Sequence, residues 1–146
     1  MKDMTEDEVR DLAGKILKFE NSDKAISGVG QLTPFNQLGF QGVKDKPDGW
    51  YLPENKESTA IILETKASKL NINKFVKEIR KNCKIVLTKY TNVIGILYNG
   101  VDIKVFKNNE EIDTVDTLQN KEYYLSLFNK NKIDKQKIYS ITKKNK

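Results

Sequence analysis

The chain of 146 residues contains no histidine and only one cysteine. Without histidine there is no serine–histidine–aspartate triad, no histidine-ligated zinc site and no imidazole acid–base chemistry. Cys83 cannot form an internal disulfide, which is typical of a protein in a reducing cytosol. It falls on the apolar side of an expected helix, which favours a buried small hydrophobe over a nucleophile.

Long apolar runs are also missing. No segment approaches the roughly 20 apolar residues that a membrane-spanning helix needs, and the acidic, polar first residues lack the apolar core of a secretory signal. We therefore expect a cytoplasmic protein with no membrane partner. A glycine-rich phosphate loop is absent as well, so nucleotide hydrolysis of that kind is not indicated.

What the chain has in quantity is charge. Charged residues make up 32% and hydrophobic residues 38% of the sequence, a balance that suits one soluble domain with a sizeable core. Its 26 basic and 20 acidic residues give a formal net charge of +6. This permits nucleic-acid binding without establishing it, because a Lys- and Asn-rich composition also follows from an AT-rich genome. The distribution of charge is therefore more informative than the total.

Chemistry concentrates in residues 46–66. Two expected strands, Lys46–Leu52 and Ala60–Lys66, flank a polar turn. The second is a nearly unbroken apolar run, as in a strand buried on both faces, and it ends in Glu64 and Lys66. Residues two apart in a strand leave the same face. If the hairpin closes around residues 54–57, Asp48 lies opposite Glu64.

Two carboxylates at the end of an apolar strand are costly, because like charges repel and the site is poorly solvated. A divalent cation removes this conflict. Mg²⁺ prefers hard oxygen ligands and usually takes one or two carboxylates, together with waters and substrate phosphate. It can also acidify a bound water and stabilise charge on a phosphate under attack. A nearby lysine can hold that water or the phosphate as a point charge.

These residues resemble a known family. Asp48 after a proline, a spacer, and Glu64-Thr65-Lys66 after an apolar strand resemble the PD-(D/E)xK nuclease signature. Residues 90–106 resemble the segment that follows it in the N-terminal nuclease domains of type I restriction subunits and related restriction-modification proteins. The likeness implies an α/β, restriction-endonuclease-like fold with a mixed central sheet flanked by helices. It also implies a metal-dependent DNA endonuclease that uses Mg²⁺, with Mn²⁺ able to substitute.

The resemblance implies roles for individual residues. Asp48 and Glu64 would be metal ligands, the backbone carbonyl of Thr65 a third ligand, and Lys66 the group that positions the attacking water or the phosphate. An acidic residue on the first helix often reaches the metal in this family, and Glu8 is the best match. Other interpretations remain open: Pro-Asp-Gly is a common turn, and Glu8 also fits a capping box with a preceding threonine.

The remaining elements follow from periodicity and turn chemistry. We expect helices over Glu6–Phe19, Asn73–Tyr90 and Leu118–Phe128, and strands over Ala25–Val29, Val93–Tyr98, Val101–Phe106 and Ile112–Val115, with Asn99-Gly100 as a hairpin turn.

Lysines recur on one side of the second expected helix, at Lys74, Lys77, Lys81 and Lys84. Such a row is often only a solvated face, but its nearly uniform sign makes contact with DNA phosphates plausible. Type I relatives typically carry a glutamine on this helix, with a tyrosine four residues away. No glutamine occurs between residues 70 and 90. Either another side chain, such as Lys77 or Arg80, supplies its role, or the protein belongs to a different branch of the family.

We expect residues 1–128 to form the nuclease-like domain and residues 129–146 to be a basic tail or a linker to a further domain. The predicted function is hydrolysis of DNA phosphodiester bonds within a restriction-modification system, with DNA and further domains or subunits as partners. Two alternatives stay open: a catalytically inactive DNA-binding module of the same fold, and a structure-specific nuclease such as a junction resolvase.

Overall fold

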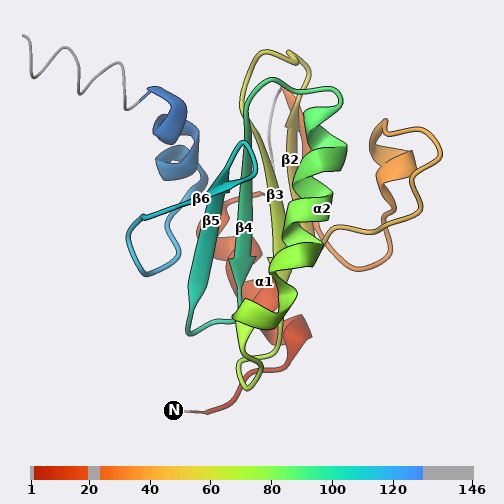
Figure 1. Cartoon of the computed structure of the whole chain (residues 1–146). Helices are drawn as coiled ribbons and strands as arrows, with labels where there is room; N and C mark the ends of the chain where they lie inside the picture. The colour runs from red at the N-terminus through yellow and green to blue at the C-terminus, as the bar shows by residue number, and fades with distance from the viewer. Residues whose placement is uncertain (1, 20–23, 130–146) are drawn as a thin grey trace, which may run out of the picture.

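One six-stranded sheet organises the chain, and its strands follow one another in sequence order (Figure 1). The computed structural model describes residues 2–19 and 24–129. The strands are β1 (Ala25–Val29), β2 (Gly49–Pro53), β3 (Ala60–Thr65), β4 (Val93–Tyr98), β5 (Ile103–Lys107) and β6 (Glu110–Ile112). β3 and β4 are parallel, and all other neighbouring strands are antiparallel.

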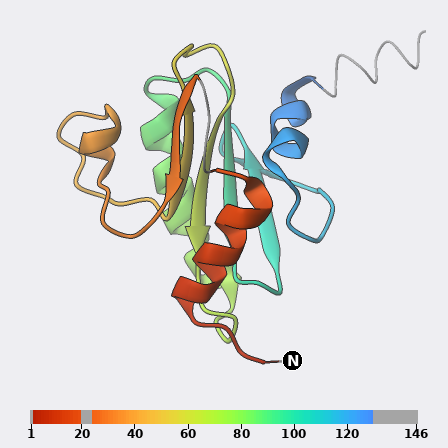
Figure 2. The same cartoon turned by 180° about the vertical axis from the view of Figure 1, so that it is seen from behind.

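Helices cover both faces of the sheet. The crossover from β3 to β4 runs through a short 3₁₀ turn, η2 (Ile72–Phe75), and helix α2 (Val76–Leu87), which covers one face (Figure 1). Helix α1 (Glu6–Leu17) and the helical residues 121–129 lie on the other face, which Figure 2 shows from the front. The structure is thus a mixed α/β fold with a mixed sheet flanked by helices, as the sequence predicts.

The apolar run of β3 is explained by this layering. Side chains alternate along the strand, so Ile62 packs in the core beneath α2, whereas Ile61 and Leu63 pack in the core beneath α1. All six residues of β3 are buried. On β4, Gly95 meets α2 so closely that an added Cβ would collide with the sulfur of Cys83. The predicted burial of Cys83 is confirmed.

Every expected helix has different boundaries in the structure: α2 ends at Leu87 and not at Tyr90, and the last helix covers residues 121–129 and not Leu118–Phe128. α1 ends at Leu17, because Lys18 takes a left-handed conformation (φ 60°) and donates its backbone N–H to the carbonyl of Gly14. The second helix does not begin at Asn73: residues 72–75 form the 3₁₀ turn η2, which the side chain of Asn71 caps.

The turns at Asn99 and Asn108 shift β5 and β6 from their expected positions. The side-chain oxygen of Asn99 accepts hydrogen bonds from the backbone N–H groups of Val101 and Asp102, so the loop spans four residues and β5 starts at Ile103. Asn108 and Asn109 both have positive φ and form the next turn. The expected edge strand at residues 112–115 therefore occurs earlier, as β6.

The described ranges contain no helix long and apolar enough to cross a membrane. The predicted tail or linker beyond Asn129 lies outside the described residues.

Candidate functional site

The candidate site lies where β2 begins and β3 ends. Antiparallel pairing places Gly49 opposite Leu63, and the backbone N–H of Asp48 donates to the carbonyl of Leu63 at 3.1 Å. Asp48 therefore comes beside Glu64, as the hairpin spacing predicts. The two carboxylates are 8% and 6% exposed, so both are almost fully withdrawn from water.

One oxygen of Asp48 accepts hydrogen bonds from Thr65, and the other forms an ion pair with Arg10. Its Oδ2 accepts hydrogen bonds from the backbone N–H of Thr65 at 2.7 Å and from the Thr65 hydroxyl at 3.2 Å. Its Oδ1 lies 3.5 Å from Nε of Arg10, a buried side chain of α1. The guanidinium of Arg10 also pairs with Asp7 and Glu6, at 2.7 and 3.3 Å. This network holds the Asp48 carboxylate in one orientation.

Glu64 faces helix α2. The side-chain amide of Asn82 donates a hydrogen bond of 2.6 Å to its Oε1. Burial raises the pKa of Glu64 to about 9. The charge of Asp48, a side-chain hydrogen bond with Asp48 and the charge of Glu78 act in the same direction, and the charge of Lys66 opposes the shift only in part. This shift favours the protonated form of Glu64 at neutral pH.

Lys66 lies on the same side of the sheet as Glu64. Its ammonium forms an ion pair of 2.8 Å with Glu78 and lies 4.3 Å from the ring centre of Phe75. Burial acts to lower the pKa of Lys66, but the hydrogen bond and charge of Glu78, with Glu6 and Glu64, raise it above the ordinary value. The side chain is thus a permanent cation, suited to donate hydrogen bonds and not to accept a proton.

A cavity of about 280 Å³ gives access to this group. It is lined by Glu64 of β3, by Glu78, Lys81 and Asn82 of α2, and by Asp45 and Lys46, which precede β2. Lys81 of α2 and Asp45 form an ion pair of 2.7 Å across it. Glu64 is therefore buried in the fold yet faces a space that a hydrated ion or a phosphate could enter.

The structure does not bring Glu8 into this group. Its carboxylate accepts the backbone N–H of Thr5, and the Thr5 hydroxyl accepts the N–H of Glu8, which completes the capping box at the exposed start of α1. The acid of the first helix that does reach the site is Glu6. It pairs with Arg10, and its charge acts on Lys66.

Two further residues of the site, Arg10 and Asn82, are not predicted from the sequence. Each is a polar residue on an otherwise apolar helix face: Arg10 lies three residues before Ala13, and Asn82 lies three residues after Ile79. A polar residue that interrupts an apolar helix face is the feature of the sequence that could have identified both residues. Asn82 also provides an amide on α2, the helix where a glutamine was missing.

The donor set fits a divalent cation. Asp48 and Glu64 are buried neighbours, and because burial and the charge of Asp48 raise the pKa of Glu64, a bound cation would take the place of the Glu64 proton. Nowhere in residues 2–19 and 24–129 do three or more acidic, histidine or cysteine side chains gather in a way that could hold a metal. Two carboxylates with waters is the ligand set that Mg²⁺ commonly accepts.

The predicted lysine row is exposed: Lys74 lies in η2, and Lys77, Lys81 and Lys84 lie on the solvent-facing side of α2. Three of these lysines, with Arg80, line a shallow cavity of about 410 Å³. Lys81 lines both this basic cavity and the one at Glu64. Lys81 therefore joins the basic cavity to the cavity at Glu64.

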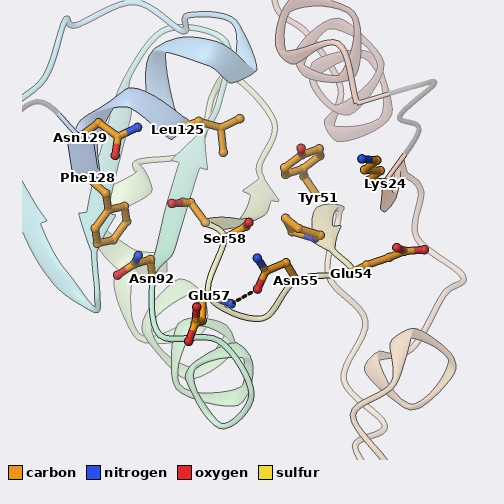
Figure 3. A pocket seen from close by; sticks show the side chains of 12 residues that line it. Lys24, Tyr51, Glu54, Asn55, Glu57, Ser58, Asn92, Leu125, Phe128 and Asn129 are labelled. Carbon is orange, nitrogen blue, oxygen red and sulfur yellow. Dashed lines mark hydrogen bonds between the residues drawn. The ribbon is translucent and has the colours of Figure 1, made fainter.

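A larger cavity, of about 680 Å³, lies at the opposite end of the sheet. Figure 3 shows it between the β2–β3 turn, where Asn55 accepts the N–H of Glu57, and the side chains of Leu125 and Phe128. Its acidic residues, Glu54 and Glu57, are exposed on the turn. Within the part of the chain that the structure describes, the buried carboxylates, Asp48 and Glu64, lie at the other end of the sheet.

Comparison of the chain with protein-family models, with curated proteins and with solved structures finds no match.

Proposed function

We propose that this chain is a Mg²⁺-dependent DNA endonuclease domain with a restriction-endonuclease-like fold, acting within a restriction-modification system. The observation that carries the proposal is the pairing of Asp48 and Glu64 at the end of β3, with Lys66 on the same side of the sheet as Glu64. The strand order, with a parallel β3–β4 pair joined through α2, agrees with the fold that the sequence resemblance implies.

In this proposal Asp48 and Glu64 hold Mg²⁺, together with the backbone carbonyl of Thr65. The bound ion supplies an acidified water and neutralises charge on the scissile phosphate. Asn82 orients Glu64, and the Thr65 N–H and hydroxyl orient Asp48. Lys66, which stays protonated, exchanges its ion pair with Glu78 for the phosphate or the attacking water.

The basic surface of α2 supplies affinity. Its exposed lysines and Arg80 form a single-sign patch beside the cavity at Glu64. Contacts of this kind with phosphate oxygens hold DNA in place without reading its sequence. They would position the backbone over the carboxylates.

One observation favours a second candidate, a non-catalytic DNA-binding module of the same fold. Each carboxylate already has a protein partner: Asp48 has Arg10 and Thr65, and Glu64 has Asn82. A site that satisfies its carboxylates in this way could persist after turnover was lost. Such a module would bind DNA without Mg²⁺, and its binding would survive Glu64→Ala.

The test combines Mg²⁺ titration calorimetry with cleavage of supercoiled plasmid, on the parent and on Glu64→Ala. Metal binding that disappears in the variant, with nicking only in the parent, supports a nuclease. Glu57→Ala is a matched control, because Glu57 is an exposed glutamate on the β2–β3 turn, at the opposite end of the sheet. If neither parent nor control binds Mg²⁺ or cuts, the nuclease proposal is wrong.

A further inference from the structure

Residues 30–47 form a long excursion between β1 and β2. The chain leaves the sheet after Val29, extends beyond its edge and returns at Asp48 (Figure 1, orange, beside α2). The base is closed by a hydrogen bond of 2.9 Å from the N–H of Gly30 to the carbonyl of Asp48. The excursion is therefore attached directly to a residue of the candidate site.

Internal contacts give the excursion a fixed shape. The N–H of Phe35 donates to the carbonyl of Asp45 at 2.8 Å, and that of Asn36 donates to the carbonyl of Val43 at 2.9 Å. Phe35 and Phe40 are buried and pack edge to face, with ring centres 5.5 Å apart. The same aromatic rings belong to the core that lies beneath α2. A binding surface carried by such an element is held in place before the partner arrives.

The surface of the excursion offers amides and one apolar side chain. Gln31, Gln37 and Gln41 are exposed, and within the described residues no hydrogen bond engages their side-chain amides. Leu32 is 78% exposed. Glutamine amides pair with the edge of adenine, and apolar side chains contact the thymine methyl group. This combination of side chains is suited to reading bases, in contrast to the lysines of α2.

Basic residues outnumber acidic residues on the excursion and, more strongly, on the helix beside it. Residues 30–47 and 74–89 together contain eight of the 26 basic residues and two of the 20 acidic residues. The rest of the sequence has 18 basic and 18 acidic residues. Both acids, Asp45 and Glu78, are neutralised by ion pairs with lysines. The Asp45–Lys81 pair also ties the excursion to α2 across the cavity at Glu64. A polyanion is therefore drawn to the surface that these two elements share.

We infer that the excursion contacts base edges of duplex DNA and gives the site its sequence preference, while the lysine row of α2 grips the phosphates. This rests on the proposed function for its substrate, duplex DNA. In this inference the two elements beside the site have different roles. Helix α2 supplies affinity for DNA of any sequence, and Gln31, Gln37 and Gln41 discriminate between base sequences.

The test uses the full chain and a library of duplexes with a randomised segment. Both the bound duplexes and the cut ends are sequenced, for the parent and for the triple variant Gln31→Ala/Gln37→Ala/Gln41→Ala. We expect the ratio between favoured and disfavoured sequences to fall about tenfold or more, since one good base contact is worth roughly that in discrimination. Total binding should change much less.

The control is Lys77→Ala/Lys84→Ala. It should weaken binding to all sequences alike and reduce the salt dependence of binding, with the preference unchanged. An unchanged preference in the glutamine variant, or a parent with no preference, overturns the inference. A parent that selects sequences but never cuts leaves the inference standing and removes the nuclease proposal. If the parent cuts with a sequence preference that the glutamine variant retains, the inference is overturned and the nuclease proposal stands.

Discussion

The side-chain amide of Asn82 donates a 2.6 Å hydrogen bond to the carboxylate of Glu64, and both groups are buried. This bond joins the middle of α2 to the end of β3. It fixes the rotamer of the acid on which the proposed chemistry depends, and it satisfies an amide that would otherwise be buried without a partner.

Replacing Asn82 by alanine should destabilise the fold. The variant loses the hydrogen bond and leaves Glu64 without its amide donor, at a cost of about 1–3 kcal/mol. Urea denaturation at pH 7 measures this directly. Lys84→Ala, an exposed position two residues further along α2, is the control and should have almost no effect. Equal stabilities of the two variants would show that the bond contributes nothing.

Glu64→Gln should stabilise the metal-free protein at neutral and alkaline pH. Because the folded-state pKa of Glu64 is raised from 4.5 to about 9, its favourable contribution is complete below pH 4.5 and is lost as pH rises toward 9. Glutamine keeps the neutral shape at every pH. The expected gain is about 3 kcal/mol at pH 7 and vanishes near pH 4.

The measurement is a series of denaturation curves between pH 4 and 9 with a chelator present. The difference in free energy of unfolding between Glu64→Gln and the parent should grow with pH. A difference that stays constant over this range would mean that Glu64 titrates normally. Adding Mg²⁺ should favour the parent over the variant, since only the parent gains a second anionic ligand.

Arg10→Met should destabilise the protein by about 3–5 kcal/mol, because it leaves the buried Asp48 carboxylate without its guanidinium neighbour. Mg²⁺ should recover part of this loss, since a cation at the site replaces the missing positive charge. The rise in melting temperature on adding Mg²⁺ is then larger for Arg10→Met than for the parent. Lys15→Met, an exposed site on the same helix, serves as control. Identical Mg²⁺ responses would argue against a metal near Asp48.

Lys66→Ala should abolish cutting while the fold remains. Removing one preorganised donor to a developing charge costs about 3–4 kcal/mol, or a factor of 10²–10³ in rate. Single-turnover plasmid cleavage measures the effect, and circular dichroism verifies the fold. A Lys66→Ala protein that cuts as fast as the parent would place the catalytic cation elsewhere.

Several features of the fold could be predicted because they depend on neighbouring residues. The apolar run at β3, the capping box at Thr5 and the hairpin that sets Asp48 beside Glu64 all follow from local periodicity and strand pairing. Strand boundaries near Asn99 and Asn108 did not, because the exact turn depends on which backbone groups the asparagine side chains engage.

The sequence by itself determined that two carboxylates and a lysine come together at one end of a buried strand, because hairpin pairing and the two-residue period of a strand are local rules. Only the tertiary structure decided which side chains complete that group. Arg10 reaches Asp48 from α1 and Asn82 reaches Glu64 from α2 because packing of the helices on the sheet sets these contacts. The same packing leaves Glu8 at the cap and brings Glu6 to the site.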